Sequence, residues 1–431
     1  MKIRIVKNKF SIIYNMILDI LLLIVLVSGY VEHISFWRLL IVILFLLTCV
    51  IYSKRLVRLF QKKISLLLSL ILLFIMLLLC SIASSSSEYT WNNIKGIIYP
   101  LLAALVYVIT IGFDIGKFKE YLHNRGLLIN IAYIINTLVL FRQISGNGFM
   151  IKKTWLLQNR YYADQCSGLF GYNSTHVYGL FSVFVLLLNL QLMKDLRNRN
   201  HRILFGIYIG LTELIVLYCA AFSDNMALYF ITPAFLMLYF LNQNQFDVLK
   251  NLATKFFKIL SFLIGALLIA YIFYRLPGIR TFTDKLIVRF TKFLFYRKVT
   301  VKGSNERFAI PMEALSHSWG WKFGIGIGTA SWRSLGAFGY SHFGLSSIGS
   351  FVYLCGIWFY LVTLYFYSNI ASNFVMYKKR FYGWKARATI VITLIFLTVY
   401  TYLFTEFRLI LLYLLILSVI QLQSNNEITH F

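Results

Sequence analysis

Residues 64–84 read ISLLLSLILLFIMLLLCSIAS, a run of apolar and small polar side chains without a single charge. A helix needs about 20 such residues to cross the hydrocarbon core of a bilayer, so this run predicts a membrane-spanning helix. The preceding segment, 53–63, reads SKRLVRLFQKK, whereas the following segment, 84–93, carries no Lys or Arg. Because basic connections stay on the cytoplasmic side, residues 53–63 are predicted to be cytoplasmic and residues 84–93 external.

The rest of the chain has the same apolar character. Of its 431 residues, 59% are hydrophobic and only 13% are charged, whereas soluble domains carry about 25% charged residues. The composition therefore predicts an all-α, polytopic membrane protein. The formal net charge of +27 does not indicate a nucleic-acid partner, because basic cytoplasmic loops account for much of such an excess in membrane proteins.

About twelve apolar runs can be placed as spans, and together they form a single membrane domain over residues 1–431. The first follows the basic sequence MKIRIVKNK and no small-x-small cleavage motif comes after it, which favours a retained signal anchor. Residues 388–423 form one apolar stretch interrupted at Thr405–Arg408, which predicts a tight helical hairpin. The predicted spans are 11–31, 37–53, 64–84, 97–114, 126–143, 174–193, 203–221, 226–242, 256–275, 346–368, 388–404 and 408–423.

The Lys and Arg counts of the short connections predict the orientation. Basic connections alternate with poorer ones, so both termini are predicted to be cytoplasmic, in the plasma membrane of a bacterium. Two predicted external connections break the rule, namely residues 142–173 and the large loop 275–344 between the ninth and tenth spans. The large loop holds eleven Lys or Arg against three acids. A topology shifted by one span would move it inside, but would place several basic connections outside.

Cations on an external loop do not serve as a topology signal, so we expect them to meet an anionic substrate. Within the large loop, residues 284–298 read DKLIVRFTKFLFYRK and separate apolar from basic side chains on a helical projection. Such a helix would lie in the membrane interface with its cations toward headgroups or a diphosphate. A surface helix packed on the protein, with solvated lysines, explains the pattern equally well.

Two shorter patterns lie at other predicted external connections. Residues 168–176 read GLFGYNSTH and place glycines and polar groups at the start of a span, where they could hydrogen-bond a sugar. An ordinary helix cap at Asn173 or Ser174 is the simpler interpretation. Residues 223–225 read SDN, and the preference of Asp and Asn for turns explains this pattern adequately.

A third pattern lies in the large loop. Asn305–Phe308 is followed by Glu313 and His317, then by GIGIGT at 324–329, and finally by His342. The glycines follow no predicted strand, so they are not a dinucleotide-binding fingerprint and no cofactor is predicted. Alternating glycines instead indicate a backbone that folds close to a ligand or to another segment.

Arg307 and His342 carry the chemistry of this third pattern. An arginine can neutralise a phosphate group, and a histidine can transfer a proton near neutral pH. A structural role explains either residue taken alone equally well. The predicted external segments hold no His, Cys or Asp cluster with the spacing of metal ligands, which favours a metal-independent site.

In this order and between these spans, the patterns resemble the Wzy-type polysaccharide repeat-unit polymerases and the related O-antigen ligases. The resemblance covers roughly residues 160–365. It rests on the Gly-x-Phe patch at 168–170, on an arginine ahead of a Gly-x-Gly element in a large external loop, and on a histidine near the end of that loop. Two features depart from the family: Ser223–Asn225 lacks the arginine of its Ser-Arg-Gly turn, and Gln165–Ser167 replaces an arginine before the patch.

The resemblance implies a glycosyltransferase acting at the outer face of the plasma membrane. It would join polyprenyl-diphosphate-linked oligosaccharide repeat units, carried on undecaprenyl diphosphate or a similar lipid, into a capsule, exopolysaccharide or O-antigen. One lipid-linked chain would donate its anomeric carbon to a hydroxyl of an incoming unit, and the lipid diphosphate would leave. The implied partners are these substrates and membrane lipid, with a flippase and a chain-length regulator as accessory proteins.

The resemblance also suggests a role for each candidate residue. Arg307 would bind the diphosphate, His342 would act as base or orienting group, and Glu313 is the alternative base. The predicted substrate-binding residues are Arg280 and Arg289 in support of Arg307, Arg160 and Lys153 for a second diphosphate, and Gly326 and His317.

Two alternative functions remain open at this point. An O-antigen-type ligase would transfer the glycan from the same lipid carrier to another acceptor, and the motifs do not separate it from a polymerase. A flippase or transporter of lipid-linked oligosaccharides is a different class, in which internal repeats, intramembrane charges and broken helices are typical. The absence of a visible sequence repeat favours the enzyme.

Overall fold

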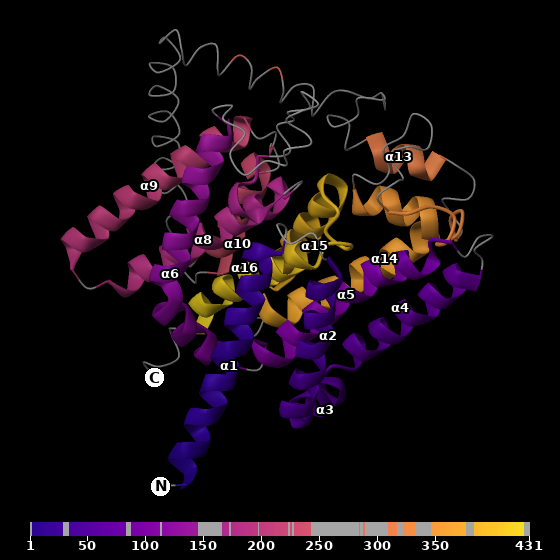
Figure 1. Cartoon of the computed structure of the whole chain (residues 1–431), viewed down its shortest axis with the longest axis horizontal. Helices are drawn as coiled ribbons and strands as arrows, with labels where there is room; N and C mark the ends of the chain where they lie inside the picture. The colour runs from indigo at the N-terminus through magenta and orange to yellow at the C-terminus, as the bar shows by residue number, and fades with distance from the viewer. Residues whose placement is uncertain are drawn as a thin grey trace.

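The structure is a computed structural model in which every described regular element is helical (Figure 1). The described residues are 2–28, 34–82, 88–112, 114–144, 166–171, 174–196, 198–222, 225, 228–242, 284, 288, 309–316, 323–332, 346–375 and 383–425. The elements are α1 (Lys2–Val27), α2 (Ile34–Ile51), α3 (Ser53–Lys62), α4 (Ile64–Ile82), α5 (Thr90–Thr110), α6 (Ile115–Arg142), η3 (Gly168–Phe170), α8 (Thr175–Asp195), α9 (Arg199–Phe222), α10 (Leu228–Asn242), α13 (Ala309–Ser316), α14 (Ser347–Val375), α15 (Gly383–Tyr400) and α16 (Phe407–Asn425).

Six of these helices, α4, α5, α6, α8, α9 and α14, are long and apolar enough to cross a membrane. Five shorter apolar helices lie within α1, α2, α10, α15 and α16. The all-α prediction is therefore confirmed, and the helices fit a membrane protein. The number of about twelve spans stays a prediction, because five of the helices are short and the predicted span 256–275 lies outside the described residues.

The core of the bundle is built around α16, which packs against α8, α5 and α14 near the middle of the molecule (Figure 1). Its side chains are buried on all sides from Phe407 to Leu422. A helix that is apolar all round is stable only when other helices surround it. The Tyr107 hydroxyl of α5 donates to the Leu414 carbonyl at 2.7 Å, which fixes the register of the two helices.

The outer helices carry apolar stripes that no described segment covers. On α6, Leu127, Ile131, Ile134 and Leu138 are exposed at the spacing of one helical face, while Tyr133 on the opposite face is buried. The helices α4 and α9 expose similar sets of leucines and isoleucines. Soluble monomers rarely present contiguous apolar surfaces of this kind, whereas lipid-facing helices require them.

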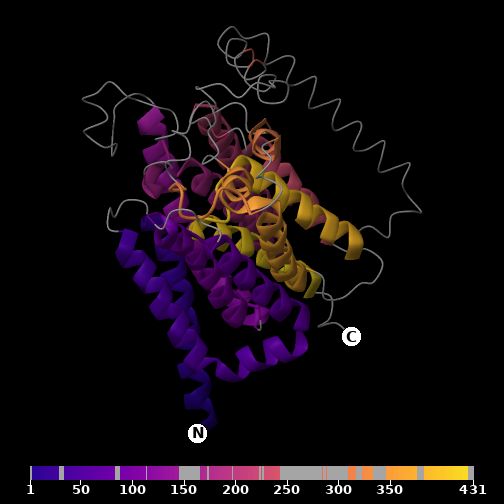
Figure 2. The ribbon, with the colours of Figure 1, turned by 90° about the vertical axis from the view of Figure 1, so that its right-hand side faces the viewer.

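Asp114 marks one end of the bundle, here called the Asp114 end. Asp114 caps α6 by accepting from the Lys117 backbone, and its carboxylate pairs with Arg55 at 3.5 Å and with Lys117 at 3.3 Å. The segment 53–63, predicted only as a basic connection, forms α3, which runs across the direction of the longer helices in Figure 2. The opposite end holds the start of α16 and is called the Arg408 end.

Candidate functional site

Most of the predicted site residues lie outside the described residues. Only Glu313 and Gly326 lie within them. The others are the catalytic candidates Arg307 and His342 and the substrate-binding candidates Arg280, Arg289, Arg160, Lys153 and His317. The predicted interfacial helix at 284–298 also lies outside, apart from Asp284 and Val288. What the structure describes is the part of the Arg408 end to which these segments are attached.

Glu313 lies on the short helix α13, which packs against α14. Ile310 and Ala314, four residues apart, are fully buried, and this spacing places both on one face of the helix. Glu313 itself is half-buried, and Met312 is exposed on the other side. The helix therefore anchors this part of the large loop to α14 and holds a carboxylate at its edge.

The helix α14 is broken at Gly356, whose φ of 84° is outside the helical range. A break frees backbone carbonyls that would otherwise accept hydrogen bonds within the helix. Here the Ile325 N–H donates to the Tyr353 carbonyl at 3.0 Å, and the Gly326 N–H donates to the Leu354 carbonyl at 3.0 Å. The glycine-rich segment thus satisfies the groups that the break exposes.

The glycines of this segment have a steric reason. A Cβ added to Gly324 would lie 2.4 Å from the backbone carbon of Leu354, and Gly324 has a φ of +66°. Gly326 has a φ of 100°, a region that side-chain-bearing residues rarely adopt. Of the two sequence interpretations, close approach to another segment is therefore observed, and the partner is α14.

Asn93, at the start of α5, also holds residues 323–332 through hydrogen bonds. Its side-chain amide donates to the carbonyls of Ile327 and Ala330, both at 2.6 Å. Its carbonyl oxygen accepts from the Trp332 backbone at 3.2 Å, and the Trp332 indole donates to the Asn93 backbone carbonyl at 3.0 Å. Residues 323–332 are thus held between α5 and α14 by a buried polar side chain.

The patch 166–171 is fastened in a similar way to the end of α6. The Gly168 N–H donates to the Gln143 side chain at 2.9 Å, and the Leu169 N–H donates to the Asn136 side chain. Gly168 has a φ of +65°, and a Cβ there would collide with Asn136. The Phe170 ring is buried against Phe181 of α8. The Gly-x-Phe pattern therefore serves packing between α6 and α8.

Arg408, in the first turn of α16, is the only charged residue that is buried in the described part of the chain, at 7% exposure. Its Nε–H donates to Glu406 at 2.8 Å, and its Nη1–H donates to the Phe170 carbonyl at 3.1 Å. Buried arginines are rare and require partners. Arg408 thus ties the patch 166–171 to the turn between α15 and α16.

The same turn, residues 400–408, also holds the start of α14. The Ser347 N–H donates to the Thr401 carbonyl at 2.8 Å, and the Phe404 N–H donates to the Ser347 hydroxyl at 3.0 Å. On its other side, the His176 ring of α8 meets the ring of Tyr400 edge-on. The 400–408 turn therefore contacts Phe170, near the end of the segment 142–173, and Ser347, three residues after the segment 275–344.

Of the turn at 223–225, the structure describes Asn225. This residue is buried, and its amide donates to the Thr175 carbonyl at 2.7 Å. A Cβ on Gly179 would lie 2.7 Å from the same amide. Asn225 therefore joins the α9–α10 connection closely to the first turns of α8, and Gly179 leaves the space that this contact requires.

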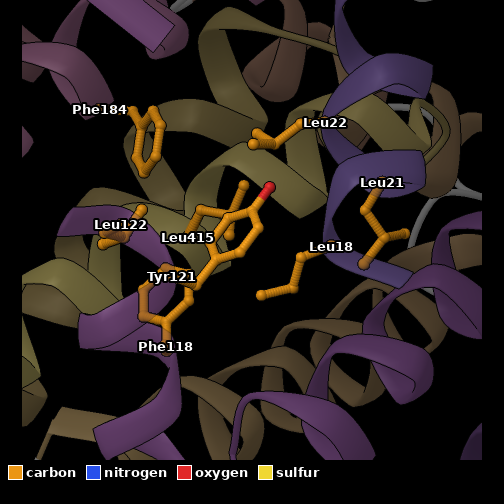
Figure 3. A pocket seen from close by; sticks show the side chains of 8 residues that line it. All are labelled: Leu18, Leu21, Leu22, Phe118, Tyr121, Leu122, Phe184 and Leu415. Carbon is orange, nitrogen blue, oxygen red and sulfur yellow. The ribbon is translucent and has the colours of Figure 1, made fainter. Parts of the chain in front are cut away.

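A small cavity lies apart from these groups, between α1, α6, α8 and α16 (Figure 3). Its lining is apolar except for Tyr121, whose hydroxyl donates to Asp19 of α1 at 2.8 Å. Asp19 also pairs with Arg125 at 2.8 Å. Leu415, which lines the cavity, lies seven residues after Arg408, or roughly 10 Å along α16. None of the residues that line this cavity carries a charge.

Sequence reasoning missed the two polar side chains that organise the Arg408 end. Arg408 had a signal, because Thr405–Arg408 is the polar interruption of an apolar stretch, but it was interpreted only as a turn. Asn93 had none, since its three partners lie more than two hundred residues away. Among the described residues, no group of His, Cys, Asp and Glu could hold a metal ion.

No protein-family model, curated protein or solved structure shows significant similarity to this chain. The class that the fold defines is an all-helical bundle with several helices fit to span a membrane. The described segments next to both predicted external loops are hydrogen-bonded to the 400–408 turn.

Proposed function

We propose that this chain is a polymerase that joins polyprenyl-diphosphate-linked oligosaccharide repeat units into a surface polysaccharide. The Arg408 end would face the outside of the plasma membrane, and both termini the cytoplasm. The reaction is a glycosyl transfer in which a hydroxyl of one lipid-linked unit attacks the anomeric carbon of another. The C–O bond to the diphosphate breaks, the lipid diphosphate leaves with the electron pair, and a base accepts the hydroxyl proton.

The observation that carries the proposal is that residues at the edges of both basic segments are hydrogen-bonded to the 400–408 turn. Phe170, at the end of 142–173, is bonded to Arg408, and Ser347, just after 275–344, is bonded to Thr401 and Phe404. A transfer between two lipid diphosphates needs two cationic regions side by side. Attachment of the edges of both segments to one turn supports that arrangement, because it would bring their cations to the same end of the bundle.

Chain length limits how far two of the predicted residues can lie from described parts of the chain. His342 precedes Ser346 by four residues, so an extended chain carries it at most about 14 Å from that residue. Arg307 precedes Ala309 by two residues, which bounds its distance from the start of α13 at about 7 Å. In the proposed reaction Arg307, supported by Arg280 and Arg289, neutralises the leaving diphosphate. His342 accepts the proton, with Glu313 as the alternative base.

Arg160 and Lys153 would bind the second diphosphate from the other basic segment. Gly326 and His317 were predicted to contact substrate, and the described role of Gly326 is to pack on α14. Its backbone N–H is already bonded to Leu354. Within the proposal, Gly326 therefore acts by holding the loop in position.

A second candidate, a transporter of lipid-linked oligosaccharides, is favoured by the broken helix α14, because transporter sites are often built on discontinuous helices near the midplane. The position of the break argues for the enzyme. The part of α14 after Gly356, residues 357–375, is about 28 Å long, close to the full thickness of the hydrocarbon core of about 30 Å. The break would then fall near the membrane boundary, and the N–H groups of Ile325 and Gly326 already bond to two of the carbonyls that it frees.

The proposal is tested by replacing Arg307 or His342 with Ala in the cell that makes the polysaccharide. We expect each variant to reach the membrane at normal abundance, to abolish polymer on a gel of surface polysaccharide, and to let single lipid-linked units accumulate. Arg333→Ala, in the same loop, and His123→Ala, an exposed histidine of α6, are the matched controls. Normal polymer length in both Arg307→Ala and His342→Ala would remove these residues from the site.

Deletion of the chain separates a polymerase from a ligase that uses the same donor. A polymerase deletion leaves one repeat unit on the carrier, as we expect. A ligase deletion leaves full-length polymer that is not attached to its acceptor, and that result would favour the alternative.

A further inference from the structure

We propose that Arg408 is the fixed cation of a binding site for a lipid-linked diphosphate at the Arg408 end of the bundle. No sequence pattern assigned Arg408 a role in binding. The proposal rests on the proposed function for the source of the ligand, and on the geometry of Arg408 for the site itself. The ligand is anionic because the group that recognises it is a guanidinium.

The first step is to count the N–H groups of Arg408 that make no hydrogen bond to the described part of the protein. A guanidinium has five N–H donors, and the described contacts use one on Nε and one on Nη1. The Nη2 group makes no hydrogen bond within the described residues, yet it is not among the enclosed polar atoms that lack a partner. Nη2 therefore reaches accessible space, although the residue as a whole is 7% exposed.

The second step is the way in which Glu406 binds the arginine. Glu406 accepts from Nε and, at 3.4 Å, from the Arg408 backbone N–H, so a single carboxylate oxygen serves both donors. The carboxylate thus leaves the paired Nη1 and Nη2 edge unoccupied by an acid. That edge is the fork that binds two oxygens of a phosphate at once. The Phe170 carbonyl orients the fork by accepting from one of its four N–H bonds.

The third step is the cost of the arrangement. Burying a charge that is only partly compensated is expensive, and an apolar residue of similar volume is often no less stable in its place. An arginine whose fork edge reaches accessible space beside Phe170 is explained by an anion that occupies that edge. If Arg408 had only a structural role, we would expect both Nη1 and Nη2 to donate hydrogen bonds to other groups of the protein.

The test measures binding of a synthetic polyprenyl diphosphate to the purified full-length protein in detergent by native mass spectrometry. Polyprenyl monophosphate and inorganic diphosphate are the comparison ligands. We expect Arg408→Gln to weaken polyprenyl diphosphate binding roughly tenfold or more, because it removes charge-assisted hydrogen bonds. Arg408→Lys should fall between Arg408→Gln and the wild type, since it keeps the charge and loses the fork. Arg125→Gln, at a partly exposed arginine of α6 that is salt-bridged to Asp19, should bind normally.

The Glu406→Gln variant distinguishes a ligand-binding role of Arg408 from a purely structural one. It keeps the guanidinium and removes the acid that competes for it, so we expect binding equal to or tighter than that of the wild type. A thermal unfolding curve for each variant restricts the comparison to folded protein. Equal loss of binding in Arg408→Gln and Glu406→Gln, or unchanged binding in Arg408→Gln, would overturn the proposal and leave the polymerase proposal intact. Binding of inorganic diphosphate through Arg408, without binding of the lipid form, would support the anion site and contradict the polymerase.

Discussion

At the scale of the residue, Asn93 does more for the Arg408 end than its place in a short connection would indicate. Its side chain makes three hydrogen bonds to the backbone of residues 327–332, and all of them are buried or partly buried. A backbone group that loses its partner inside a protein costs far more than the bond contributed. The fixed position of the glycine-rich segment therefore depends strongly on this one amide.

Replacing Asn93 with Ala should destabilise the folded protein by about 3 kcal/mol, because three backbone groups lose their partner at roughly 1 kcal/mol each. Asn92, the neighbouring residue, is exposed, so Asn92→Ala should change stability by less than about 0.5 kcal/mol. Denaturant unfolding of both variants in detergent measures the difference. Equal stability of the two variants would show that the Asn93 contacts do not hold the segment.

At the scale of the element, the broken helix α14 and residues 323–332 form one unit. The two freed carbonyls of α14 accept from Ile325 and Gly326, and the Cys355 carbonyl accepts from the Cys80 thiol of α4 at 3.4 Å. The break in α14 depends on residues 323–332, because without their N–H donors its carbonyls would be unsatisfied inside the bundle. Gly356 is the residue that permits the break.

Gly356→Ala should destabilise the break, since its φ of 84° is unfavourable for a residue with a side chain. We expect the backbone amides of residues 323–332 to exchange with deuterium faster in this variant, because their acceptors move. Gly116→Ala is the control, as no atom lies within 4 Å of the Cβ it adds. Unchanged exchange at 323–332 in Gly356→Ala would separate the segment from the break.

The positions of the helices were largely predictable from sequence, because long apolar runs such as 64–84 have few alternatives. The role of the alternating glycines at 324–328 was predictable in part. The sequence indicated that their backbone lies close to a ligand or another segment, but it did not identify α14 as that segment. Arg408 and Asn93 were not predictable as organising residues, since their partners come from distant parts of the chain. Tertiary hydrogen bonds of this kind leave no periodicity in the sequence.

At the scale of the whole molecule, the bundle separates an apolar perimeter from two polar ends. Basic residues such as Arg55 and Lys117 lie at the Asp114 end, which the charge rule assigns to the cytoplasm. The Arg408 end holds the anchors of both basic segments. The proposed reaction requires this end to be external, because the lipid-linked units are polymerised outside the membrane.

Labelling of single introduced cysteines tests this orientation in intact cells. Ser304→Cys, in the large loop, should react with a membrane-impermeant maleimide without permeabilisation. Asn200→Cys, exposed at the start of α9, should react only after permeabilisation. Four of the five native cysteines are buried and Cys49 is half-buried, so the unmodified chain serves as the blank. The reverse labelling pattern would overturn the topology and the mechanism together.

Reconstitution tests the central claim most directly. The purified chain is placed in liposomes with a single species of polyprenyl-diphosphate-linked repeat unit, and the lipid-linked products are separated by size. A ladder of lipid-linked oligomers, lost in Arg307→Ala and in His342→Ala, is the predicted result. A folded wild-type protein that leaves every unit a monomer would contradict the account.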